Sequence, residues 1–180
     1  MYCRSLRQPQ SSLAVPGVED ARRLYHQLGL DPTKTRPSSE ALLRRVLKGE
    51  ALYRINTLVD AINLSSLRAQ LPFGLYDLAR VVPPVVLRRG ATGESYEGIR
   101  KGPVHLQDRP VLADAQGPFG NPSSDSARTM ITTATHDALV IVYAPARSRD
   151  ARLQEVLDWT ASLVGRVCGG WKEVRTLIGS

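Results

Sequence analysis

A run of glycine, serine and acidic residues in the second half of the chain could bind a ligand or act on it. Residues 113–129 read ADAQGPFGNPSSDSART. Gly117 and Gly120 carry no side chain, so a ligand could approach the backbone closely there. The serines that follow offer hydroxyl groups, and Asp125 can accept hydrogen bonds from nearby amides or from Arg128. This pattern fits a ligand-binding loop, and it also fits a turn stabilised by its own serine and aspartate side chains before a strand.

Three short polar side chains share one stripe of a predicted helix upstream of this loop. Asn56, Asp60 and Asn63 lie at i, i+4 and i+7 within a helix that the apolar spacing predicts over residues 52–67. Asparagine and aspartate are poor helix formers, so three of them in register suggest a purpose. That purpose is either to cap a neighbouring loop or to line a pocket.

Basic side chains gather on two predicted helices in the N-terminal third. The chain has a net charge of +7 and a pI of about 9.8, and a basic domain is attracted to phosphate backbones. The cluster is either an ordinary solvated helix face or an RNA contact. The cluster consists of Arg22, Arg23, Arg44, Arg45 and Lys48.

Several common chemistries lack their signatures. His26, His105 and His136 stand apart without metal-ligand spacing, and no glycine-rich phosphate loop or nucleophile elbow is present, so we expect neither a metal nor a cofactor. Two cysteines are too few for a disulfide framework or a structural zinc site. The longest apolar run, residues 138–146, is shorter than the roughly 20 residues of a membrane span. The sequence shows no apolar secretory stretch near its start, and we expect a cytoplasmic protein.

The predicted secondary structure that must position these residues changes from helices to strands along the chain. Residues 1–16 are predicted to be a loose leader and residues 17–180 one domain. Helices are predicted first, at 18–28, at 38–48 with Ser38 or Ser39 as the cap, and at 52–67. Strands follow at 81–88, 104–106, 111–113, 127–135 and 139–143, and a helix covers 150–167 before a possible last strand at 174–178. Helices and strands that are segregated in this way indicate an α+β fold.

Several ordered motifs resemble a known family. They are the SSEAL run at 38–42, INTLVDAIN at 55–63, LPFGLYD at 71–77, GESYEGI at 93–99, and the loop from Gly117 to Thr129. Together they resemble the B3/B4 domain of the bacterial phenylalanyl-tRNA synthetase beta subunit, and most closely its free-standing form. The resemblance implies a three-layer fold with a β-sandwich-like core flanked by helices. In the synthetase this domain holds an editing site, which hydrolyses tyrosine wrongly attached to the phenylalanine tRNA.

The resemblance also suggests which residues form the pocket. A pocket asparagine of the synthetase falls on Asn63. The sequence departs from the synthetase at Gly74, where the family has a histidine, and near Asn121, where it has a glutamate. We therefore do not expect tyrosine editing by the same groups. Asp125 is the nearest carboxylate to act as a base or to hold Arg128, and Glu94 is a second candidate. The substrate-binding residues are predicted to be Asn56, Asn63, Gly74, Gly117, Phe119, Asn121, Ser123, Ser124, Ser126 and Arg128.

Two functions of different classes fit these features. The first is a trans-acting hydrolase that deacylates misacylated tRNA, with tRNA or aminoacyl-tRNA as its partner and the amino acid left open. Such an ester is already activated, so a pocket that positions it and donates hydrogen bonds to a developing oxyanion can supply much of the effect. The second is a non-catalytic module that binds tRNA or an amino acid, and a weaker third is an accessory tRNA-binding domain that acts with a separate enzyme.

Overall fold

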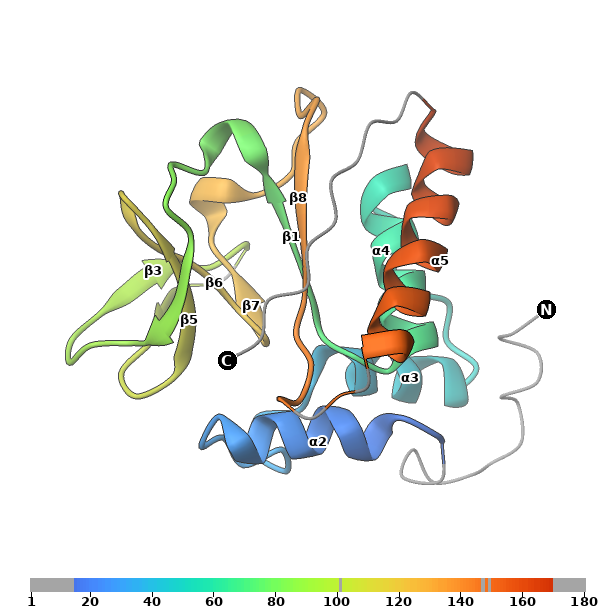
Figure 1. Cartoon of the computed structure of the whole chain (residues 1–180), viewed down its shortest axis with the longest axis horizontal. Helices are drawn as coiled ribbons and strands as arrows, with labels where there is room; N and C mark the ends of the chain where they lie inside the picture. The colour runs from blue at the N-terminus through green and yellow to red at the C-terminus, as the bar shows by residue number, and fades with distance from the viewer. Residues whose placement is uncertain (1–14, 101, 147, 149, 170–180) are drawn as a thin grey trace.

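Three helices precede the first strand in the computed structural model, which describes residues 15–100, 102–146, 148 and 150–169 (Figure 1). They are α2 (Val18–Gln27), α3 (Ser38–Leu47) and α4 (Thr57–Ala69). The first two lie where the sequence predicts them. The third begins at Thr57 rather than Leu52, because the Asn56 side chain accepts a hydrogen bond from the Val59 amide at 2.8 Å and caps the helix there.

Short antiparallel strands make up the middle of the chain. One sheet pairs β1 (Phe73–Asp77) with β8 (Ala138–Val142), and a small ribbon pairs β3 (Ser95–Glu97) with β4 (Pro103–His105). The third sheet has the order β2-β5-β6-β7. Its strands are β2 (Val86–Arg89), β5 (Pro110–Asp114), β6 (Gly117–Asn121) and β7 (Ser124–Asp125). The final helix, α5 (Asp150–Cys168), follows β8 as predicted.

Several local predictions are wrong. The predicted strand 127–135 is instead the short 3-10 helix η3 (Ala127–Thr129), which the Ser126 side chain caps by accepting from the Arg128 amide, followed by a turn. Conversely, the first five residues of the predicted loop form β6. Neither Ser38 nor Ser39 caps α3, whose N-cap is Pro37 without a side-chain hydrogen bond. The predicted strand at 174–178 and residues 1–14 of the leader lie outside the described residues.

The β1–β8 pair stands between the larger sheet and the helices, which gives the fold three layers (Figure 1). Successive side chains of β1 point to opposite layers, as the period of a strand requires. Leu75 packs with Ile62 of α4 and Val164 of α5, whereas Tyr76 packs with Phe119 and other residues on the sheet side. The chain therefore has the predicted α+β fold, and β1 links the two halves of its core.

Candidate functional site

A pocket of about 230 Å³ lies where helices α3 and α4 meet the turn between β6 and β7. The turn, residues 121–125, and Asn63 of α4 both line it. Apolar walls come from Phe73 at the start of β1 and from Ile99. The lining residues are Ser38, Asn63, Phe73, Ile99, Asn121, Pro122, Ser123, Ser124 and Asp125. Segments far apart in the sequence thus build one polar hollow with an apolar flank.

The polar stripe of α4 has two different uses. Asn56 caps the helix, and Asp60 accepts from the Ile55 amide at 2.9 Å and pairs with Arg54. Only Asn63 of the three lines the pocket. The structure therefore gives Asn56 a capping role at the start of α4, and it places Asn63 in the lining of the pocket.

The turn that lines the pocket is organised by Asn121. Its Oδ1 accepts hydrogen bonds from the backbone amides of Ser123 and Ser124 at 2.8 and 2.9 Å. Its Nδ2 donates to the hydroxyl of Tyr96 at 2.9 Å. Asn121 is buried, and both the oxygen and the nitrogen of its side-chain amide are hydrogen-bonded. It therefore fixes the conformation of the turn.

Four tyrosine hydroxyls lie at or behind the same turn, and none of them was predicted from the sequence. Tyr25 donates to the Pro122 carbonyl at 2.9 Å and lies 2.9 Å from Ser123 Oγ. Tyr96 donates to the Ser124 carbonyl, and Tyr76 donates to Asp125 Oδ1 at 2.7 Å. Tyr143 stands behind Tyr76, with 3.1 Å between the two hydroxyl oxygens. Burial raises the pKa of Tyr25 to about 12 and raises the pKa values of the other three as well, so all four remain neutral donors near pH 7.

The structure places the remaining candidate residues away from the pocket lining. Glu94 is bound by Arg88 through two hydrogen bonds, one of 2.8 Å, and this partner lowers the pKa of Glu94 despite its partial burial. Arg128 is held by Asp114, with Nη2 to Oδ1 at 2.9 Å, whereas the sequence offered Asp125 as one possible partner. Ser126 caps η3.

Three further candidates shape the core or the strands. Phe119 is fully buried and meets Tyr76 edge to face, with ring centroids 4.9 Å apart. Gly117 has a φ of +118° at the start of β6, a conformation that favours glycine. Gly74 lies under the ring of Tyr76, so that a Cβ added there would come within 2.7 Å of two ring carbons.

The predicted basic cluster divides into structural and exposed residues. Arg22 forms a two-bonded ion pair with the buried Glu40, both at 2.9 Å, and so ties α2 to α3. Arg45 pairs with Glu50 and stacks on Tyr53. The side chains left exposed for a polyanion are those of Arg23, Arg44 and Lys48.

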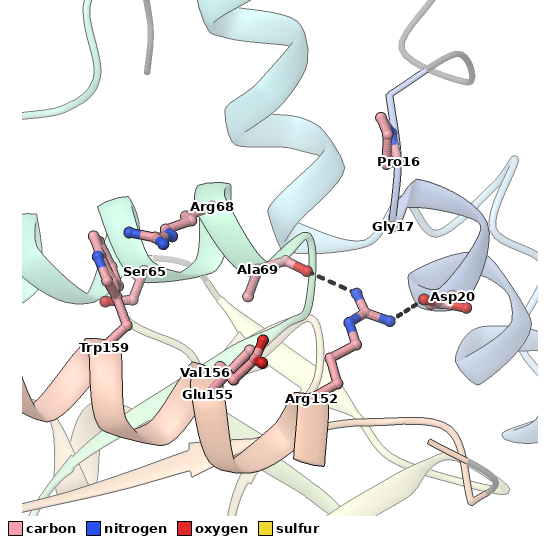
Figure 2. A pocket seen from close by; sticks show the side chains of 10 residues that line it. All are labelled: Pro16, Gly17, Asp20, Ser65, Arg68, Ala69, Arg152, Glu155, Val156 and Trp159. Atoms are coloured by element: carbon pink, nitrogen blue, oxygen red, sulfur yellow. Dashed lines mark hydrogen bonds and ion pairs between the residues drawn. The ribbon is translucent and has the colours of Figure 1, made fainter. Parts of the chain in front are cut away.

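A second hollow, of about 490 Å³, lies between the N-terminus of α2 and helices α4 and α5 (Figure 2). Arg152 bridges it by donating to Asp20 and to the Ala69 carbonyl, as the dashed lines show. Arg68 stacks over Trp159, with its guanidinium carbon 4.4 Å from the ring centroid. These contacts join the three helices, and none of the predicted site residues lines this hollow.

Within the described part of the chain, no three histidine, cysteine, aspartate or glutamate side chains are grouped to hold a metal ion. Every helix in that same part is too short or too polar to cross a bilayer.

The fold is shared with a domain of an aminoacyl-tRNA synthetase. The structure is similar to the crystal structure of an N-terminal fragment of the phenylalanyl-tRNA synthetase beta subunit from Pyrococcus horikoshii, with a TM-score of 0.52 and 16% sequence identity. The similarity covers 64% of this chain and 42% of that one, so this chain spans less than half of the fragment's length. No curated protein matches the sequence.

The family model of the B3/4 domain matches residues 20–162. The chain therefore belongs to the B3/4 domain family, which confirms the resemblance seen in the sequence motifs.

Proposed function

We propose that the protein is a trans-acting hydrolase that removes a wrongly attached amino acid from tRNA. The observation that carries the proposal is the pocket itself, because Asn63 of α4 and the 121–125 turn line one hollow of about 230 Å³. The resemblance to the synthetase editing domain points to the same asparagine. Membership of the B3/4 domain family, and a neighbour that is a fragment of a phenylalanyl-tRNA synthetase, support a tRNA-linked role.

The chemistry would be hydrolysis of the ester between the amino acid and the terminal ribose. The Asp125 carboxylate would take a proton from a water molecule as that water attacks the carbonyl carbon. The Asn63 amide would donate a hydrogen bond to the negative charge that forms on the carbonyl oxygen. The carbon–oxygen bond to the ribose then breaks, and the ribose hydroxyl leaves with the proton. The apolar wall of Phe73 and Ile99 would face the amino acid side chain.

The alternative is a non-catalytic module that binds tRNA or an amino acid, and one observation favours it. Among the nine residues that line the pocket, Asp125 alone is acidic or basic, and none is a histidine. A single carboxylate can bind an ammonium group as readily as it can serve as a base. The two functions differ in whether amino acid is released.

Two pocket variants and a matched control on the same helix test the hydrolase. Asn63→Ala and Asp125→Ala should each lower the hydrolysis of the preferred aminoacyl-tRNA by about tenfold or more, which corresponds to roughly 1.4 kcal/mol in the barrier. Asn56→Ala removes the same side chain from the capping position of α4. It should cost about 1 kcal/mol of stability and leave hydrolysis unchanged below the melting transition.

Thermal melts of the same variants separate catalysis from folding. If the pocket variants melt far below the wild type, their side chains are structural and the assignment fails. Equal hydrolysis by Asn63→Ala and Asn56→Ala would also contradict it.

A further inference from the structure

Two buried tyrosine hydroxyls stand in line behind the Asp125 carboxylate. Tyr76 Oη donates to Asp125 Oδ1 at 2.7 Å, and Tyr143 Oη lies 3.1 Å from Tyr76 Oη. A tyrosine hydroxyl carries a single proton. Because Tyr76 gives its proton to the carboxylate, Tyr143 must be the donor of the second bond. The chain of donors therefore runs from Tyr143 through Tyr76 to Asp125.

The backbone around Tyr76 leaves its hydroxyl little choice of position. A Cβ at Gly74 or at Gly120 would lie 2.6 to 2.7 Å from the Tyr76 ring carbons and closer still to the hydroxyl oxygen. The ring therefore occupies the space that two missing side chains leave, one on β1 and one on β6. Phe119 meets the same ring edge to face at 89°, and Tyr76 is fully buried. A ring held on these sides presents a fixed donor to Asp125.

Three of the titratable groups that interact with Asp125 are tyrosines from different parts of the fold. Tyr76 belongs to β1, Tyr143 follows β8, and Tyr96 belongs to β3. Burial, followed by the charge of Asp125, raises the pKa of Tyr143 and of Tyr96. All three stay protonated over the range in which a carboxyl group titrates, so the pair behind Asp125 acts through hydrogen bonding and not through charge.

We propose that Tyr76 and Tyr143 are positioning residues that hold the Asp125 carboxylate ionised and oriented at the pocket. The catalytic consequence of this proposal rests on the proposed hydrolase function, in which Asp125 acts as the base. The other two tyrosines hold the backbone of the turn, through the Pro122 and Ser124 carbonyls. This division supplies a matched control, because Tyr25→Phe removes a hydroxyl from the same turn without touching the Asp125 carboxylate.

The direct test is a carbon-13 NMR titration of the Asp125 side-chain carboxyl in aspartate-labelled protein. Its resonance is assigned by its absence in Asp125→Asn. Tyr76→Phe should move the midpoint of that titration upward by about one pH unit, because a hydrogen bond to the ionised form is lost. Tyr143→Phe should move it in the same direction by less, and Tyr25→Phe should leave it in place.

Two results would overturn the proposal. The first is an unchanged Asp125 midpoint in Tyr76→Phe, and the second is an equal shift in Tyr25→Phe, which would mean that the turn as a whole is responsible. If Tyr76→Phe does not fold, the Asp125 midpoint in Tyr143→Phe tests the proposal instead, because this variant leaves the Tyr76–Asp125 bond in place.

Kinetics provide the second readout. Tyr76→Phe should lower kcat for aminoacyl-tRNA hydrolysis by about fivefold to tenfold with little change in KM. It should also shift the acidic limb of the plot of kcat against pH to higher pH. Tyr25→Phe should leave that limb unmoved. A wild-type protein that releases no amino acid would refute the hydrolase function, and the NMR titration would still decide whether the tyrosine pair holds Asp125.

Discussion

Gly74 is a position at which one added carbon should damage the site. A Cβ in Gly74→Ala would lie 2.7 Å from Cε2 and Cζ of Tyr76, whereas carbon atoms normally approach to about 3.5 Å. The Tyr76 ring is rigid and fully buried, so it cannot relieve the clash by a small rotation. It must leave its place, and its bond to Asp125 must break.

The cost can be estimated from the contacts that are lost. Overpacking a core costs about 1–3 kcal/mol, a hydrogen bond to a charged group contributes about 1.5–3 kcal/mol, and the edge-to-face contact with Phe119 about 0.5–1.5 kcal/mol. Because these contributions share one ring, they do not add fully. We expect Gly74→Ala to lose about 3 kcal/mol in free energy of unfolding, measured by urea denaturation, and about 6–12 °C in Tm.

Gly102→Ala is the control, since no atom lies within 4 Å of a Cβ added there and its φ is not in the left-handed region. Its stability should stay within about 0.5 kcal/mol of the wild type. A Gly74→Ala protein as stable as Gly102→Ala would show that Tyr76 is not confined as the structure indicates.

Three further predictions concern specificity, pH and RNA. Gly74→His restores the synthetase residue but should release no tyrosine from Tyr-tRNA, because Tyr76 already fills that space; efficient release by it or by the wild type would contradict this. Burial opposes ionisation of Asp114, but the hydrogen bonds from Arg128 and two backbone amides outweigh it and lower its pKa. The stability that Asp114 contributes is therefore present above pH 4 and lost as the pH falls through its folded value. Urea midpoints of wild type and Asp114→Asn should converge as the pH falls below about 4, and a constant gap would refute the assignment. Labelled tRNA should bind weakly with strong salt dependence, and Arg44→Ala should lower the slope of log K against log salt by about 0.7–0.9; flat binding would exclude a tRNA role.

The helices were predictable because periodicity records which face is buried. Val18, Leu24 and Tyr25 fall on the stripe that α2 buries, and the amphipathic pattern at 150–167 predicts α5 almost to its ends. The start of α4 was predicted too early because Leu52 and Ile55 continue the apolar spacing. The helix begins where the Asn56 side chain caps it. Apolar spacing cannot reveal this position, because a single capping hydrogen bond leaves no mark in the pattern of apolar residues.

The pocket was predicted in part, and the missing part depends on contacts between distant segments. Asn63 and the 121–125 turn were identified from local chemistry and from the family motifs. The tyrosines were missed because strand alternation marks Tyr76 and Tyr96 only as buried residues, with no sign of where their hydroxyls end. The sequence offered Asp125 as one possible partner of Arg128, whereas the Arg128 guanidinium binds the Asp114 carboxylate and the carbonyl of Gly117, which faces Asp114 across the β5–β6 pair.

Release of free amino acid from a panel of aminoacyl-tRNAs, measured against spontaneous hydrolysis, tests the central claim most directly. The panel should include correctly and wrongly charged tRNAs, with substoichiometric protein so that only turnover is counted. We predict that the wild type releases amino acid from at least one misacylated tRNA well above the spontaneous rate, and that Asp125→Ala and Asn63→Ala lose most of this activity. Spontaneous rates across the whole panel, with aminoacyl-tRNA nevertheless bound, would contradict the hydrolase and establish a binding module in its place.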